Sequence, residues 1–144
     1  MKMDPSGAGF ADVSQRVGRV VAEDERVRFV YLFGSRASGR PQSSSDTDLA
    51  VWIDLPLSFR EVAVLQDGLA AALGDVDLLV LNDAALWLQF RVLGEGVVVF
   101  SRDERARIRF RERVEKHFLD FRHLHDAYLA AVRDRARAGT LSRG

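Results

Sequence analysis

The stretch GSRASGRPQSSSDTDLAVWI, residues 34–53, decides the fold of this 144-residue chain. The preceding residues 27–33, VRFVYLF, are β-branched and aromatic, which predicts a buried strand that stops at Gly34. Residues 35–45 are polar and rich in serine, so they predict a loop. Residues 48–54 predict a second strand, in which Leu49, Val51 and Ile53 face the core and Asp48, Ala50 and Trp52 face the other side. The stretch therefore joins two strands through one polar loop.

Outward from this stretch, hydrophobic spacing and turn residues predict the remaining elements of the domain. The first is a helix over residues 10–24, and the second is a helix from Ser58 to about Leu73 with Gly74 as its cap. A strand over 76–81 follows. A short helix then runs from Asn82 or Asp83 through Leu93 and ends at Gly94, and a strand covers 97–100. This order predicts an α/β (α+β) fold, with a small mixed β-sheet and helices packed on it.

Residues 103–138 contain no glycine or proline and predict one long C-terminal amphipathic helix. Such a helix would span roughly 50 Å, whereas a domain of this size has a radius of gyration of only about 15 Å. We therefore expect it to bend, to break or to reach past its own domain. Its aromatic residues are expected first as core packing against the sheet, and any part beyond the domain as a partner site: Phe110, Phe118, Phe121 and Tyr128.

The composition limits the function classes. Lys plus Arg and Asp plus Glu both number 21, but residues 1–101 carry 9 basic and 14 acidic side chains, and residues 102–144 carry 12 and 7. We expect a catalytic domain over the first range and a helical extension over the second, with no direct binding of nucleic acid. The absence of cysteine excludes disulfides and thiolate chemistry. Without an apolar run long enough for a bilayer, we expect a cytoplasmic protein.

The chemistry is predicted where the first strand meets the loop and the second strand begins. A glycine at a strand end, Gly34, lets the backbone approach a phosphate, and the hydroxyl of Ser35 can donate to its oxygens. Asp46 and Asp48 are two residues apart on an extended segment, so their carboxylates point to the same side. Such carboxylates suit Mg²⁺ bound together with substrate phosphates, and two ions are expected.

A third carboxylate should complete the site, and the third strand offers two. We prefer Asp77 to Asp75, because a neighbouring strand can place Asp77 beside Asp48, where it could also accept a proton. Asp54 is too far along its strand, roughly 20 Å from Asp48, to share the metal. Alone, an Asp-x-Asp pair is more often a solvated strand edge, but the glycine, the serine and the spacing favour a functional site.

These residues resemble the signature of the nucleotidyltransferase fold of the DNA polymerase β superfamily. The stretch GSRASG…SDTDLAVW resembles that of its minimal nucleotidyltransferases, the MNT proteins. The resemblance continues through VDLLVL, residues 76–81, and the long final helix. It implies a set of roles: phosphate binding at Gly34 and Ser35, metal binding at Asp46 and Asp48, and the third carboxylate at Asp77. Arg36 either contacts a phosphate or pairs with a nearby carboxylate.

Many MNT proteins are antitoxins paired with HEPN toxins, which are helical ribonucleases. The resemblance therefore implies an enzyme that uses ATP and Mg²⁺ to transfer AMP to a tyrosine hydroxyl of a cognate HEPN toxin and so neutralises it. Two alternatives stay open: an antitoxin that acts by steric binding through its C-terminal helix, and a nucleotidyltransferase that modifies a small molecule. A homo-oligomer is compatible with each of them.

Overall fold

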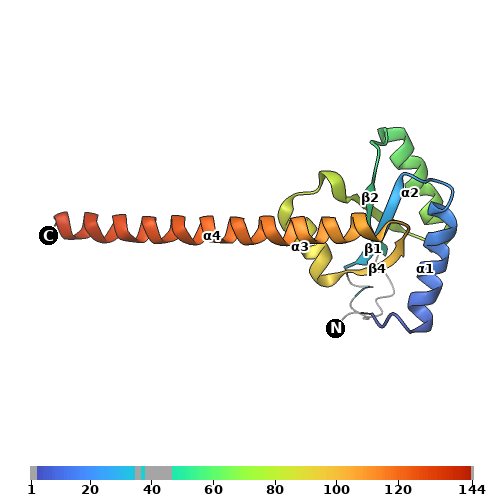
Figure 1. The fold of residues 1–144 in the computed structure, drawn as a ribbon, viewed down its shortest axis with the longest axis horizontal. Coiled ribbons are helices and arrows are strands. Elements are labelled where there is room, and N and C mark those ends of the chain that lie inside the picture. Colours follow the sequence, from blue (N-terminus) through green and yellow to red (C-terminus); the bar gives the residue numbers. More distant parts are fainter. Residues whose placement is uncertain (1–2, 35–36, 38–46, 144) are drawn as a thin grey trace.

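The computed structural model describes residues 3–34, 37 and 47–143 and shows a four-stranded sheet with helices on both faces (Figure 1). This confirms the small mixed sheet with flanking helices that the sequence predicts. In chain order the elements are α1 (Ala8–Val21), β1 (Val27–Phe33), β2 (Thr47–Ile53), α2 (Phe59–Leu73), β3 (Val76–Val80), the 3₁₀ turn η1 (Leu81–Asp83), α3 (Leu86–Glu95), β4 (Val97–Ser101) and α4 (Glu104–Arg143).

The strands lie in the order β3-β2-β1-β4. The central strand β1 is antiparallel to both of its neighbours, and Leu32 is the register partner of Leu49 on β2 and of Val97 on β4. The pair β2–β3 is parallel. A parallel pair needs a crossover connection, which α2 supplies. The beginnings of β2, β3 and β4 and the end of β1 therefore lie at one end of the sheet.

Strand alternation gives the sheet two apolar faces, and each face is covered by a different pair of helices. Helices α1 and α2 cover the face that carries, among others, Val30, Leu32, Leu49 and Val51. Helices α3 and α4 cover the face that carries Phe29, Tyr31, Ala50 and Trp52. As predicted, Leu49, Val51 and Ile53 share one core face, and Ala50 and Trp52 lie on the other. In Figure 1 the two helix layers lie to either side of the strands.

The predicted ends of α2 are confirmed. The Ser58 side chain accepts a hydrogen bond from the Glu61 backbone N–H, and the Glu61 carboxylate accepts one from the Ser58 N–H, at 3.2 and 3.1 Å. This reciprocal pair satisfies two donors that the first turn would leave unpaired. At the other end Gly74 has φ 87°, a conformation that glycine adopts without strain.

Four predicted helix ends are wrong, namely both ends of α1 and both ends of α3. Helix α1 spans Ala8–Val21 instead of residues 10–24. Asn82 does not cap α3, because its amide group binds the backbone N–H and carbonyl of Ile53, at 3.0 and 2.7 Å, and α3 begins at Leu86. Gly94 lies inside α3, which ends at Glu95. The Gly96 N–H still donates to the Val92 carbonyl at 2.7 Å, so the turn continues past Gly94.

Helix α4 reaches past the domain, which was one of the three predicted outcomes for a helix of this length (Figure 1). Its aromatic residues therefore divide into two groups. Phe110 is buried on the sheet and Phe118 stacks on Phe90 of α3, with ring centroids 3.8 Å apart. Phe121 and Tyr128 are 58% and 65% exposed, so core packing is the wrong expectation for them. The predicted boundary at residues 101/102, between a catalytic domain and a helical extension, stays a prediction. Within the described residues, no helix combines the length and apolarity that a membrane span requires.

Candidate active site

Asp48 and Asp77 lie side by side at one end of the sheet. Asp48 is the second residue of β2, Asp77 is the second residue of β3, and the two are register partners across the parallel pair. Neighbouring strands are about 4.8 Å apart. The β2 alternation places Asp48 on the same side as Ala50 and Trp52, the face covered by α3 and α4. The structure thus brings together the two carboxylates that the sequence pairs.

Gly34 makes room for one of these carboxylates. It follows β1 directly and has φ 76°, which is unfavourable for a residue with a side chain. A Cβ atom at this position would collide with Oδ2 of Asp48 and would lie 3.1 Å from its Cγ. The sequence predicts that this glycine allows a phosphate to approach the backbone. The structure shows a second reason why residue 34 is glycine: the Asp48 side chain occupies the space that a larger residue would fill.

The edge of the site is held by backbone contacts. The N–H of Thr47 donates to the carbonyl of Asp75 at 2.9 Å, which joins the beginnings of β2 and β3. The Thr47 side chain is buried, on the sheet face opposite to Asp48. Sequence reasoning gave Thr47 no role, and no side-chain signal could have found this contact, because the bond uses the backbone N–H. A second backbone contact involves Ala37, three residues after Gly34. The N–H of Met3 donates to the carbonyl of this buried residue at 2.6 Å.

Three predicted site residues, Ser35, Arg36 and Asp46, lie outside the described residues, and their roles stay predictions. Among the residues that are described, no three His, Cys, Asp or Glu side chains gather closely enough to hold a metal ion. The described part of the predicted metal site is therefore the pair Asp48 and Asp77. Both supply carboxylate oxygens, which are the ligands that Mg²⁺ prefers.

The structure separates the remaining acidic candidates from this pair. Asp54 follows the far end of β2, is exposed and pairs with Arg28 at 3.0 Å. This placement agrees with the prediction that it is a strand end and no metal ligand. Asp75 precedes β3 and contributes its backbone carbonyl to Thr47. Of the acidic residues around β3, Asp77 is the one in register with Asp48.

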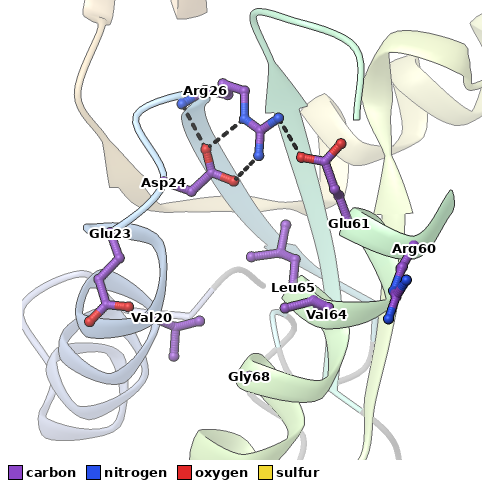
Figure 2. Close-up of a pocket in the computed structure, with 9 residues that line it drawn as sticks. All are labelled: Val20, Glu23, Asp24, Arg26, Arg60, Glu61, Val64, Leu65 and Gly68. Atoms are coloured by element: carbon purple, nitrogen blue, oxygen red, sulfur yellow. Dashed lines mark hydrogen bonds and ion pairs between the residues drawn. The ribbon is translucent and has the colours of Figure 1, made fainter. Parts of the chain in front are cut away.

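A cleft of about 610 Å³ lies elsewhere, between α1 and α2 (Figure 2). Its floor is apolar, and its polar wall is an ion-pair cluster in which Arg26 bridges Asp24 at 3.0 Å and Glu61 at 2.6 Å. The guanidinium lowers the pKa of Asp24. The Ser58 N–H and then Arg26 lower that of Glu61. The cluster has one cation and two carboxylates. The cleft lies in the α1–α2 layer, on the opposite side of the sheet from the face that carries Asp48.

Comparison with solved structures identifies chains of the same fold. A chain of a toxin–antitoxin complex with AMP-PNP is 24% identical, with a TM-score of 0.69 over 83% of this chain and 97% of that chain. A chain in the structure of a tri-AMPylated Shewanella oneidensis HEPN toxin with its MNT antitoxin is 23% identical, with a TM-score of 0.64 over 83% and 95%. A chain of the MntA–HepT toxin–antitoxin complex is 22% identical, with a TM-score of 0.64 over 83% and 96%.

The comparison with curated proteins gives no match. Residues 15–105 match the family described as Polymerase beta, Nucleotidyltransferase. This range contains the end of β1 with Gly34, the Asp48–Asp77 pair and the whole sheet. The sequence signature, the sheet and the position of the two carboxylates agree with the match. The chain therefore belongs to the polymerase β nucleotidyltransferase family.

Proposed function

We propose that this protein transfers AMP from ATP to a tyrosine hydroxyl of a cognate HEPN toxin and thereby neutralises the toxin's ribonuclease activity. The observation that carries this proposal is the in-register pair Asp48–Asp77 beside Gly34 at one end of the sheet. Membership of the nucleotidyltransferase family supports the reaction class. The names of similar structures, which include AMP-PNP and a tri-AMPylated HEPN toxin, support ATP as donor and a toxin as acceptor.

Two Mg²⁺ ions would be held by Asp46, Asp48 and Asp77, with Asp46 contributed from outside the described residues. The fit rests on the donor set, because the Asp48 and Asp77 carboxylates are neighbours across two strands and supply hard oxygen ligands. When bound, such ions neutralise phosphate charge and favour deprotonation of the attacking hydroxyl.

The residues of the chain then have separate tasks. Gly34 and Ser35 hold the nucleotide phosphates, and Arg36 assists them. The tyrosine oxygen of the acceptor forms a bond to the α-phosphorus, and the bond from that phosphorus to the bridging oxygen breaks. Pyrophosphate leaves with the electron pair of the broken bond. Asp77 receives the hydroxyl proton, which its exposed position at the edge strand β3 allows.

The test is to incubate the protein with ATP, Mg²⁺ and the product of the adjacent gene, and to measure the intact mass of that partner. We expect added AMP on a tyrosine with the wild-type chain and no addition with Asp48→Asn. A partner that is bound but never modified would overturn the transferase proposal.

A second candidate, neutralisation by binding alone, is favoured by the exposed extension of α4. The two functions separate in cells that express the partner. If Asp48→Asn protects growth as fully as the wild-type chain, binding is sufficient. If protection is lost while the complex still forms, transfer is required.

A further inference from the structure

The last part of α4 is a helix with an apolar face that no described residue covers. Residues 119–138 are all exposed, a length of about 30 Å. Six large apolar side chains on this segment are 44–72% exposed, and one of them, Leu119, lies on the opposite side of the helix from the other five. Those five are Phe121, Leu124, Tyr128, Leu129 and Val132. In Figure 1 the segment projects from the domain on the side away from α1 and α2. Contiguous apolar surface of this kind marks an interaction site.

The five side chains form one broad arc, which we call the α4 arc. At 3.6 residues per turn, Leu124 and Leu129 lie about 140° apart and bound it, with Phe121, Tyr128 and Val132 between them. Within these bounds, from Phe121 to Val132, the only other side chain is that of His125, whose ring stacks on Phe121 at 5.9 Å. The arc thus contains no Asp, Glu, Lys or Arg. It needs an apolar partner surface.

The α4 arc continues an interface that already exists in the molecule. Phe110 and Val114, which are buried against the sheet, lie on the same side of the helix as Phe121 and Tyr128. Between the two groups, Phe118 stacks on Phe90, and Trp87, one turn away on α3, is 64% exposed. A partner on the arc would therefore meet the domain at α3 as well.

The width of the arc indicates the shape of its partner. A two-stranded coiled coil buries a narrow seam, whereas a helix that packs into a core buries a stripe wider than about 100°. We propose that the α4 arc inserts into an apolar groove between two helices of the HEPN toxin. This rests on the proposed function, because it takes the toxin as the partner. A second copy of this chain, pairing through α4 alone, would cover the centre of the arc and leave one rim exposed.

Two matched double variants of the full-length chain test the docking. Phe121→Glu with Tyr128→Glu places two charges in the arc, and His123→Glu with Ala130→Glu places the same charges at the same spacing on the opposite face. We expect the first pair to weaken binding of the adjacent gene's product by about 100-fold or more and the second to leave it within about threefold. Equal effects of the two pairs, or no complex with the wild-type chain, would overturn the proposal. Circular dichroism verifies that both variants keep their helix.

Single substitutions at the rims test the two-helix groove. Leu124→Glu and Leu129→Glu should each weaken binding by about tenfold or more, because both rims are buried in a groove. A loss at only one rim would contradict the groove. A wild-type chain that sediments as a dimer, and becomes monomeric in the Phe121→Glu, Tyr128→Glu variant, would show that a second copy occupies the arc. Asp48→Asn should bind normally in every assay, so failure of AMP transfer is scored separately from failure of docking.

Discussion

The carboxylate of Asp48 occupies the space where a side chain at residue 34 would lie. Gly34 has φ 76°, and Oδ2 of Asp48 is the nearest atom to the Cβ position that this backbone would give. One glycine therefore serves two requirements, a left-handed backbone at the end of β1 and room for a carboxylate at the beginning of β2. Gly74 also has a positive φ, 87°, but no atom lies within 4 Å of its Cβ position.

This contrast predicts different outcomes for the same substitution. Gly34→Ala and Gly74→Ala should each cost about 1–2 kcal/mol of unfolding free energy, because each forces a Cβ atom into the left-handed region. Only Gly34→Ala should also displace Asp48 and lower AMP transfer, by about 100-fold or more. Urea unfolding measures the first effect, and the partner's mass after a timed incubation measures the second. Equal transfer by the two variants would show that the position of Asp48 is unimportant for catalysis.

The register of β2 and β3 predicts which aspartate of the third strand is catalytic. Asp77→Asn should lower transfer by about 10²–10⁴-fold, since it removes a proton acceptor and a carboxylate ligand beside Asp48. Asp75→Asn is the matched control, because the backbone carbonyl that binds Thr47 is retained and the side chain precedes the strand. The rates are compared by single-turnover labelling at equal partner occupancy. A larger loss at Asp75 would reverse the assignment.

The local elements of the fold were predictable, because they depend on residues near one another in the sequence. The strand Val27–Phe33 has its predicted bounds, and α2 has its predicted caps. The strand order and the antiparallel placement of β4 were not predictable, because they depend on pairing between distant segments. The prediction that Asn82 caps α3 was wrong for the same reason, since its side-chain amide binds Ile53, 29 residues away in sequence.

The site was predictable to the extent that strand alternation determines on which side of the sheet each side chain lies. The pairing of Asp77 with Asp48 follows once β3 lies beside β2 in parallel register. The collision at Gly34 was not predictable, because it depends on the distance in space between two strands that residues 34–46 separate in the sequence. The burial of Phe110 and the exposure of Tyr128 likewise depend on where α4 leaves the domain, and the same helical spacing fits both.

The ion-pair cluster around Arg26 predicts that the unfolding free energy depends on pH in the acidic range. The pKa values of Glu61 and Asp24 are lowered in the folded protein, so their contribution is complete at neutral pH and is lost as the pH falls through these lowered values. Below about pH 4 the unfolding free energy should fall more steeply for the wild-type chain than for Arg26→Met. The Arg26→Met curve stays sloped, because Ser58 still donates to Glu61. Parallel curves from urea unfolding at pH 7, 5, 4 and 3 would contradict this.

The last prediction concerns how much of α4 the fold requires. Phe110 and Val114 are each 1% exposed, and Phe110 contacts Phe29 and Trp52 with ring centroids 5.6 and 5.1 Å apart. A Phe→Ala change at a buried site costs about 3–5 kcal/mol, and a domain has only about 5–15 kcal/mol of stability in total. A chain that ends at residue 102 lacks both side chains and should not fold cooperatively.

A chain that ends at Leu119 keeps Phe110, Val114 and the Phe118–Phe90 stack, and the side chains of residues 120–138, which it loses, are all exposed. It should unfold cooperatively, within about 5 °C of the Tm of the full chain. It should also fail to bind the partner, because the α4 arc is gone. Thermal unfolding by circular dichroism and titration calorimetry measure the two properties. If the chain ending at Leu119 unfolds without cooperativity, the exposed half of α4 stabilises the domain as well as presenting a surface. If it binds as tightly as the full chain, the partner docks elsewhere.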